Sequence, residues 1–427
     1  MLYKFLFFIG RVIRNPSLKS YHEFLKTSET WSKEELLKYQ FDKCKSFLEF
    51  TYIYSPYYRK VFQEIGFLPN EMTSLEDIKK IPCMDKTELL NNTSSVHTTY
   101  SFKKIFHSET SGTTGQPLKF ARNEEWDSHN RAAMFRGYSW HGIKVWDKNG
   151  YFWGYNLDKS AVVKTKLLDK LQNRFRLFSY NKNEILRFIK KLKYAKYLHG
   201  YSSMIYEVAK IVNKMNLDGK YNLKMIKGTS EKIYENYHNE VNKAFGLKII
   251  SEYGAAETGL IAFECEKGNM HINVENVIVE IEDGEIIVTN LLSKSFPIIR
   301  YKLGDKVTLS DPDFICSCGR NHPVIIDILG RVGRKIIGYQ KKYPSFTFYY
   351  VFKNLALNSN IVLNFQAVQN EIGKVTLLIE QPENDPSKLL QNELYKYFSD
   401  DIDFTVKYEQ NFHVKEGKLK DFITSID

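Results

Sequence analysis

One loop carries the strongest chemical signal in the chain, the eight residues Thr110-Ser111-Gly112-Thr113-Thr114-Gly115-Gln116-Pro117. Glycines let the backbone approach an anion closely, and consecutive N–H groups together with hydroxyls form an anion-binding concavity. We therefore predict a phosphate cradle. A P-loop is excluded because no lysine follows the second glycine. An ordinary solvated turn is the alternative, since turns are built from the same residue types.

Three further segments contain residues that could complete a nucleotide site. Tyr253 is followed by Gly254 and, shortly after, by Glu257, so an aromatic ring could stack on a base while the carboxylate holds a metal on a phosphate. Asp305, expected at the end of a strand, could accept hydrogen bonds from two vicinal ribose hydroxyls. Lys418 follows a glycine on an expected exposed turn. The plain alternatives are a turn residue for Asp305 and a solvated lysine for Lys418.

A second cluster is rich in metal ligands. Cys265 and His271 precede a predicted hairpin, and Cys316 and Cys318 follow it in a C-x-C arrangement. Three thiolates and one imidazole suffice for a closed tetrahedral zinc site, with His322 as the alternative fourth ligand. The C-x-C spacing is tighter than the usual C-x₂-C, and buried free cysteine is the competing interpretation.

Composition sets limits on the class of protein. The chain has 427 residues, 43% hydrophobic and 26% charged, which is ordinary for a globular protein. Its net charge of +11 is spread along the chain, which favours anionic substrates or membranes over nucleic acid. Five scattered cysteines and no evident signal peptide argue against a disulfide framework. We expect a cytoplasmic protein.

The first fourteen residues are apolar with interspersed Lys and Arg. They are too few to span a bilayer and lack a small-residue cleavage site. The segment is expected either to pack on its own domain as a helix or to lie in a membrane interface, which would place the protein at the inner face of the membrane.

The pattern of elements predicts an α/β fold in two domains. Residues 32–67, 184–215 and 231–245 have helical periodicity, whereas 223–228 and 247–250 are typical of strands, so the large domain is expected to have layered sheets with helices on their faces.

Further along, the chain becomes richer in strands. Asp283-Gly284 predicts a hairpin between strands 277–282 and 285–290. Beyond Gly330 we expect strands near 361–365 and 374–380 and a helix over 386–398. The predicted domains are a large one, 1–330, and a small α+β one, 331–427.

In the order and spacing of these motifs the whole chain resembles the adenylate-forming superfamily of acyl-CoA synthetases and adenylation domains. It is most similar to the phenylacetate-CoA ligase branch, which includes capsular-polysaccharide biosynthesis relatives. Segments 55–58, 75–78 and 81–86 look like the N-terminal region of that branch. The resemblance implies a large adenylation domain followed by a small lid that rotates between the two half-reactions about a hinge at residues 331–334.

The resemblance also implies roles for single residues. The adenosine and phosphate groups of ATP would be held by Thr110, Ser111, Gly112, Thr113, Thr114, Gly115, Gly228, Thr229, Ser230, Glu231, Tyr253, Gly254, Asp305 and Arg331. The catalytic residues would be Glu257, which binds Mg²⁺, and Lys418, which supports adenylation from the lid. Structural Zn²⁺ would be bound by Cys265, His271, Cys316 and Cys318, because some relatives in the branch carry a similar cluster.

The implied activity is ATP-dependent activation of a carboxylic acid as an acyl-adenylate. Transfer to CoA or to another thiol or amine would follow, and the capsular relatives imply a setting in surface polysaccharide biosynthesis. Two departures from the family pattern stand out, because Ala256 replaces the usual Thr or Ser before Glu257 and Gly333 is followed by Arg334 at the hinge. They favour an amine or sugar acceptor over CoA, or a catalytically degenerate fold that acts as a membrane-associated scaffold.

The acyl pocket is predicted only by position. Residues 153–155 and 199–203 lie where the substrate pocket of the family lines up, but they could equally be core aromatics and a helix N-cap.

Overall fold

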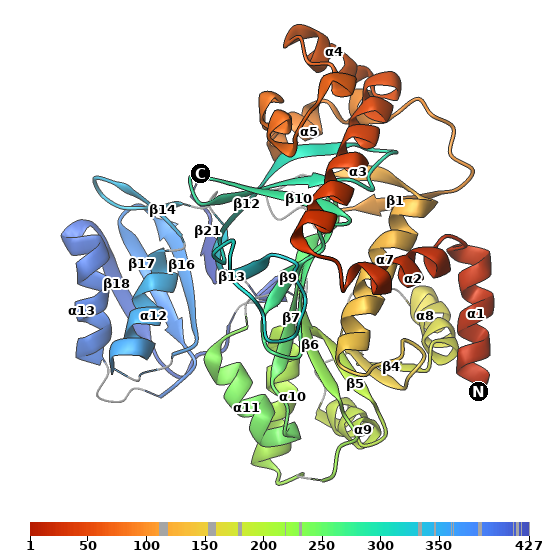
Figure 1. Ribbon diagram of the computed structural model, residues 1–427. Helices are drawn as coiled ribbons and strands as arrows, with labels where there is room; N and C mark the ends of the chain where they lie inside the picture. Colours follow the sequence, from red (N-terminus) through yellow and green to blue (C-terminus); the bar gives the residue numbers. More distant parts are fainter. Residues whose placement is uncertain are drawn as a thin grey trace. The chain divides into compact units, whose positions relative to one another are not determined.

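The computed structural model describes the chain except for residues 111–117, 153–158, 178–181, 218, 230–232, 332–334, 346, 360, 362, 383–386, 413, 416–417, 420 and 427. The described chain divides into two compact units (Figure 1). Unit 1 contains Met1–Trp146 and Glu252–Ile328, and unit 2 contains Asp147–Ser251 and Leu329–Asp427.

Unit 1 begins with a series of helices and one hairpin. Ser32 begins the longest of the helices with a reciprocal capping box to Glu35, and Ser55 ends it because the residue before Pro56 is driven into an extended conformation. The helices are α1 (Leu2–Arg14), α2 (Leu18–Ser28), α3 (Lys33–Tyr54), α4 (Pro56–Glu64), α5 (Lys86–Asn91), α6 (Thr93–Val96) and α7 (Glu124–Trp140), with short 3₁₀ turns at Pro69–Glu71 and Leu75–Lys80 and a hairpin of β1 (Ile105–Glu109) and β2 (Lys119–Asn123).

An antiparallel sheet completes unit 1. Its strands pair in the order β10-β11-β12-β13-β9-β8-β7. They are β7 (Ile249–Ala255), β8 (Gly259–Glu264), β9 (Met270–Ile272), β10 (Val277–Glu282), β11 (Glu285–Asn290), β12 (Ile298–Leu309) and β13 (Val324–Arg331). Apolar side chains of α3, α4 and these strands form one buried core, including Phe47, Phe62, Ile286 and Ile298. This core fixes the strands that carry most of the predicted site.

A buried ion pair joins helix α7 to the segment after β9. The Arg136 guanidinium contacts the Glu275 carboxylate at 2.6 Å and donates to Asn273 Oδ1 at 2.7 Å. Both charged side chains are almost completely buried. Burial by itself raises the pKa of Glu275, but Arg136 and His322 outweigh it, and the pKa lies well below its ordinary value. Glu275 is therefore ionised, and its charge is compensated inside the protein.

Replacing Arg136 with methionine should destabilise unit 1 by about 3–5 kcal/mol, because it leaves a buried carboxylate without its partner. Urea unfolding at neutral pH measures this, with Arg131→Met on the same helix as the control. The Arg131 side chain is 37% exposed, and its buried partner Asp127 keeps Arg122 at 3.2 Å, so this substitution should cost only about 1 kcal/mol. Because folding lowers the pKa of Glu275, its contribution to the free energy of unfolding is fully present above about pH 4.3. This contribution is lost as the pH falls below that value. Equal effects of the two substitutions would contradict this account.

Unit 2 contains a parallel sheet covered by helices. Its strands pair in the order β7-β6-β5-β3-β4, with β7 contributing its first residues, Ile249–Ser251. The elements are β3 (Asn149–Phe152), α8 (Lys159–Leu171), β4 (Arg174–Arg176), α9 (Lys182–Leu192), β5 (Tyr197–Tyr201), α10 (Ser202–Lys214), β6 (Met225–Thr229) and α11 (Glu235–Phe245). Leu198, Ile226 and Phe152 pack with α9, α10 and α11 in a second core.

The last part of unit 2 has a core of its own. A four-stranded sheet in the order β18-β17-β16-β21 packs against α12 and α13, which lie together on one of its faces (Figure 1). The elements are β14 (Lys335–Ile337), β15 (Lys342–Pro344), α12 (Thr347–Ser359), β16 (Phe365–Glu371), β17 (Lys374–Ile379), α13 (Ser387–Phe398), a 3₁₀ turn at Ser399–Asp401, β18 (Asp403–Lys407), β19 (Val414–Lys415), β20 (Lys418–Leu419) and β21 (Phe422–Thr424).

The α/β class and most predicted elements are confirmed. The 277–290 hairpin has its turn at Asp283-Gly284, with both residues at positive φ. The single helix predicted over 184–215 is wrong, because the buried strand β5 separates α9 from α10. The strand predicted at 361–365 lies at Phe365–Glu371 instead. The domain boundary at 330/331 stays a prediction.

Candidate nucleotide site and metal centre

The β7–β8 hairpin of unit 1 carries the predicted adenine motif. Tyr253 and Gly254 lie within β7, not after a strand as the sequence had indicated, because pairing with β8 extends to Ala255. Gly254 is required at this point, since a Cβ there would lie 2.2 Å from the carbonyl oxygen of Gly259. The Tyr253 hydroxyl donates to Asp305 Oδ2 at 2.7 Å. The structure thus brings together two residues separated by about fifty positions in the chain.

Asp305 lies inside β12 and not at the end of a strand. Glu285 of β11 pairs with Lys306 and Ile287 with Lys302, so β12 has additional residues in a bulge between these pairs. Gly304 adopts a φ of 83° in this bulge. The bulge interrupts the strand pattern, which explains why the sequence suggested a strand end here. The strand itself continues to Leu309. The bulge sets the direction in which the half-buried Asp305 carboxylate presents itself beside Tyr253.

Glu257 occupies the tight connection between β7 and β8. Glu257 is 7% exposed, and its carboxylate accepts a hydrogen bond from the Tyr301 hydroxyl at 3.2 Å. Asn290 Nδ2 donates to the Glu257 carbonyl at 3.2 Å, which fixes the backbone. A carboxylate held in this way has lone pairs left for a hard cation. Because Mg²⁺ is commonly bound through one or two carboxylates plus substrate phosphates, the residue fits the predicted ion.

Only the first residue of the predicted phosphate loop is described. The Thr110 hydroxyl accepts a hydrogen bond from Leu118 N at 2.9 Å, and Thr110 N donates to the Leu118 carbonyl at 2.9 Å. These two bonds close the base of the loop at the end of the β1–β2 hairpin. Ser111, Gly112, Thr113, Thr114 and Gly115 lie outside the described residues.

The remaining predicted nucleotide residues belong to unit 2. Gly228 and Thr229 lie at the C-terminal end of β6, and a Cβ on Gly228 would approach Ser202 Oγ to 2.4 Å. In parallel sheets ligands bind beyond the carboxyl ends of the strands, so the position suits the prediction. Arg331 ends β13 and Lys418 begins β20. Ser230, Glu231 and Gly333 lie outside the described residues, as does the segment 153–155 of the predicted acyl pocket.

The second segment of the predicted acyl pocket, residues 199–203, spans the end of a strand and the start of a helix. His199 and Tyr201 are buried in β5, and Ser202 and Ser203 begin α10. Gly200 has a φ of 141°, and a Cβ there would lie 2.3 Å from the Phe152 carbonyl oxygen. Burial and the nearby Arg174, Lys227 and Arg176 lower the pKa of His199, which is therefore neutral. No side-chain hydrogen bond that would mark a helix N-cap is seen at Tyr201.

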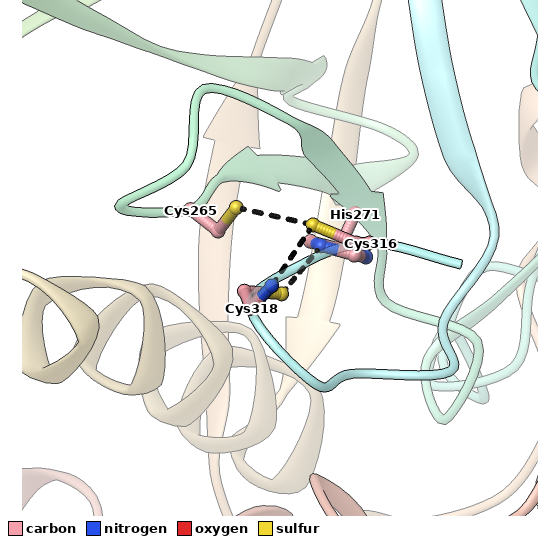
Figure 2. A group of neighbouring side chains, drawn as sticks. All are labelled: Cys265, His271, Cys316 and Cys318. Atoms are coloured by element: carbon pink, nitrogen blue, oxygen red, sulfur yellow. Dashed lines mark hydrogen bonds between the residues drawn. The ribbon is translucent and has the colours of Figure 1, made fainter. Parts of the chain in front are cut away.

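The four predicted metal ligands converge in unit 1. The candidate ligand atoms of Cys265, His271, Cys316 and Cys318 all lie within 4.8 Å of one another. Figure 2 shows these side chains pointing toward a common centre, with the Cys265 and Cys316 sulfurs 3.9 Å apart and Cys318 Sγ 3.2 Å from His271 Nε2. Cys265 follows β8, and His271 lies on β9. The cysteine pair comes from the segment between β12 and β13.

The electrostatics of the cluster suit a cation. Burial and the neighbouring thiols Cys318 and Cys316 raise the pKa of Cys265 to about 12. Burial, together with His322 and Arg320, lowers the pKa of His271 to about 4. Neutral imidazole is the form that binds metals, and the thiols lose their protons when a cation binds. Backbone or amide N–H groups of Lys267, Asn269 and Cys318 already donate to the sulfurs, as outer-shell groups do in metal sites.

His322, the alternative fourth ligand, has a different role. Its ring Nε2 lies 2.9 Å from the Glu275 carboxylate, and its backbone carbonyl oxygen lies 2.9 Å from His271 Nδ1. The carbonyl thereby orients the His271 ring with Nε2 toward the cluster. Through Glu275 the same residue connects the cluster to Arg136 on α7. His322 thus supports the ligand set and is not part of it.

Three residues that support the candidate nucleotide site were not predicted from the sequence. Tyr301 and Asn290 hold Glu257, and Asn130 Oδ1 accepts from Leu260 N at 2.6 Å, which fixes the start of β8. Tyr301 lies four residues before Asp305 on β12, but the bulge at Gly304 interrupts the alternation of side chains between them, so strand periodicity gave no signal for Tyr301. Asn130 and Asn290 come from distant segments and gave no local signal.

Comparisons with known proteins give relatives at low sequence identity. No protein-family model matches the chain. Protein CapK of Staphylococcus aureus is 22% identical over 425 residues, which cover 92% of this chain and 88% of CapK. A phenylacetate-coenzyme A ligase of Thermus thermophilus is 23% identical over 332 residues, which cover 72% of this chain and 73% of the ligase.

The predicted resemblance is therefore confirmed. The chain is related to the phenylacetate-CoA ligase-like branch of the adenylate-forming enzymes. The fold agrees: a crystal structure of 2-hydroxyisobutyryl-CoA ligase in the postadenylation state superimposes with a TM-score of 0.73 at 16% identity, covering 93% of this chain and 91% of that one. At this identity the structural likeness shows the fold, and the substrate must be argued separately.

Proposed function

We propose that this protein is an AMP-forming ligase, which activates a carboxylic acid with ATP and passes the acyl group to a thiol or amine. The observation that carries the proposal is the constellation of Tyr253, Asp305 and Glu257 in unit 1, linked by the Tyr253–Asp305 and Tyr301–Glu257 hydrogen bonds. An aromatic ring, a ribose-binding carboxylate and a metal-binding carboxylate are the groups that such a reaction needs. Relatives of this branch that are ligases by name add support.

In the proposed reaction an oxygen of the carboxylic acid attacks the α-phosphorus of ATP, and pyrophosphate leaves. Negative charge accumulates on the phosphate oxygens as the acyl-adenylate forms. Glu257 would hold Mg²⁺, which offsets that charge, and the backbone of the Thr110–Gly115 loop would donate hydrogen bonds to the phosphates. Asp305 would accept from the ribose hydroxyls while Tyr253 packs on the adenine, and Lys418 would bring a positive charge to the reacting oxygens.

The acceptor enters in the second half-reaction. A thiol or amine attacks the acyl carbon of the adenylate, and AMP leaves with the oxygen that joined them. CoA is the acceptor in the name of the phenylacetate ligases, whereas a sugar or amine acceptor without CoA is the alternative that Ala256 favours. Ala256 is exposed beside Glu257 and has no hydroxyl for a phosphate. A degenerate scaffold is the third hypothesis, and the retained Asp305 and Lys418 disfavour it because a scaffold needs neither residue.

We further propose that Cys265, His271, Cys316 and Cys318 bind a structural Zn²⁺. Three sulfurs and one imidazole nitrogen fill a tetrahedral shell, so no position remains open for a substrate. The ion would join the end of β8 to the segment before β13. Because β8 begins two residues after Glu257, the metal would stiffen the strand that positions the magnesium ligand.

The biological setting is also a proposal. Similarity to CapK over 92% of the chain, together with the resemblance stated above, supports a role in surface polysaccharide biosynthesis. An ATP-dependent reaction of this kind is expected in the cytoplasm, and the cell-envelope connection suggests its membrane side. None of the described helices is long and apolar enough to cross a bilayer.

Isotope exchange between pyrophosphate and ATP tests the proposal against a panel of aromatic, fatty, amino and sugar acids. We expect exchange that requires Mg²⁺ and one class of acid, and a decrease of about 100-fold in Lys418→Ala. Lys415→Ala is the matched control, because Lys415 pairs with Lys418 in the same hairpin. Absence of exchange with every acid, together with absence of ATP binding, would contradict the proposed function and favour the scaffold.

A further inference from the structure

Helix α1 is attached to unit 1 by one face. Phe7 packs edge-to-face on Phe135 at 5.8 Å between ring centroids, and Phe7 and Phe8 both contact Trp146. After the helix, the buried Asn15 donates to Asp127 Oδ2 at 2.9 Å and to Ser128 Oγ at 3.0 Å. These contacts fix the orientation of α1. The packed-helix expectation is thus confirmed for this face.

The opposite face of α1 is apolar and exposed. Positions 2, 5, 9, 12 and 13 follow the helical repeat, so their side chains share one side of the helix. The five residues at these positions are Leu2, Phe5, Ile9, Val12 and Ile13. Their exposed fractions lie between 42% and 71%. A cluster of bulky side chains of this kind is unusual on the surface of a protein without a partner for it. We refer to these five residues as the α1 stripe.

The charges of α1 indicate what kind of surface covers the stripe. The helix has three basic residues, Lys4, Arg11 and Arg14, and no acidic residue. Arg14 has the Asp127 carboxylate 3.9 Å away, but Lys4 and Arg11 have no carboxylate partner among the described residues. Lys4 and Arg11 contact the Phe8 ring at 5.9 and 5.0 Å, beside the attached face. The helix therefore presents apolar bulk together with uncompensated positive charge.

We infer that α1 docks this protein on an anionic lipid surface, with the α1 stripe inserted among the acyl chains and Lys4 and Arg11 near the headgroups. Thirteen residues of helix measure only about 20 Å, so the helix lies in the interface and does not cross the bilayer. A second copy of the chain fits less well. Pairing two α1 stripes would bring like charges together without an acidic residue on either helix to offset them.

Vesicle sedimentation of the full chain tests the inference. The protein should bind phosphatidylcholine vesicles that contain phosphatidylglycerol, and binding should weaken with salt and in vesicles of phosphatidylcholine alone. The double substitution Phe5→Ser with Ile9→Ser should reduce the affinity at least about tenfold, because it removes two inserted side chains. Ile315→Ser is the control, since Ile315 is more exposed than Phe5 or Ile9 but lies outside α1, next to Cys316.

A fluorescence readout separates insertion from loose attraction. In the variant Phe5→Trp, with its emission compared with that of the unmodified chain, the added tryptophan should shift to the blue on anionic vesicles and be quenched by brominated acyl chains. Ile315→Trp should show neither effect. The inference is overturned if the serine variants bind vesicles like the unmodified protein. It is equally overturned if the chain ignores vesicles and instead forms a dimer that Phe5→Ser with Ile9→Ser dissociates.

Discussion

Replacing Glu257 with glutamine should lower the rate of acid-dependent pyrophosphate exchange by about 100- to 1,000-fold. The amide keeps an oxygen that can accept from Tyr301, so the loop between β7 and β8 should retain its shape. What is lost is the negative charge that holds Mg²⁺ against the phosphates of ATP. Exchange rates measured over a series of magnesium concentrations would show both a lower maximum and a weaker dependence on the ion.

Glu282→Gln is the matched control for this experiment. Glu282 is an exposed carboxylate in the same unit, on the β10–β11 hairpin, with Lys302 as an ionic neighbour at 3.7 Å. Its substitution should leave the exchange rate within about twofold of the original, as expected for surface charges. If Glu257→Gln exchanged as fast as Glu282→Gln, the assignment of the magnesium ligand would be wrong.

Replacing Cys316 with serine should abolish zinc binding and destabilise unit 1 by more than about 4 kcal/mol. Cys316 is buried at the centre of the cluster, 3.9 Å from Cys265 and within hydrogen-bonding distance of Asn269. A hydroxyl is a far poorer zinc ligand than a thiolate, and the binding free energy of a structural ion is free energy of folding. Metal analysis of the purified chain and thermal unfolding with and without a chelator measure the two effects.

Cys83→Ser serves as the control for the metal centre. Cys83 is half-exposed and lies outside the cluster, with Glu282 as its hydrogen-bond partner. Its substitution should leave the zinc content at about one ion per chain and the unfolding temperature almost unchanged. A chain that contains no zinc as isolated, takes none up, and unfolds identically in Cys316→Ser would contradict the metal site.

Loss of the metal should also affect the turn that holds Glu257. Strand β8 runs from the turn that holds Glu257 to Cys265, and the network of His322, Glu275 and Arg136 joins the cluster to α7. Asn130 on α7 in turn fixes Leu260 at the start of β8. Both ends of this strand therefore depend on contacts that the metal would stabilise. This arrangement explains how a site with no open coordination position could still support nucleotide binding.

Local sequence signals predicted the elements that depend on local physics. Asp283-Gly284 specifies a two-residue hairpin turn because both residues tolerate positive φ, and the structure has that turn. Residues 184–215 were misread because all five residues of β5 are buried, so the strand lacks the alternation of polar and apolar side chains that would separate it from the neighbouring helices. The order of the strands within the sheets could not be predicted from the local sequence pattern.

The site shows the same division. Residue types and spacing suggested a metal cluster and the resemblance implied zinc, and the structure brings the four candidate ligands together across about fifty residues of chain. Asp305 was found by its motif, but its position inside β12 depends on a bulge against β11 that no local pattern reveals. Asn130 and Asn290 support the Glu257 turn from α7 and β11, and such contacts follow only from tertiary packing.

The most direct test of the central claim follows an oxygen atom. The protein is incubated with ATP, Mg²⁺ and an acid identified by pyrophosphate exchange, labelled with oxygen-18 in its carboxylate, and hydroxylamine is added to trap the activated acyl group. Adenylation predicts pyrophosphate and AMP as products, with one labelled oxygen transferred from the acid to the phosphate of AMP. Release of ADP with the label in inorganic phosphate would contradict the account, because the acid would then have been activated as an acyl phosphate.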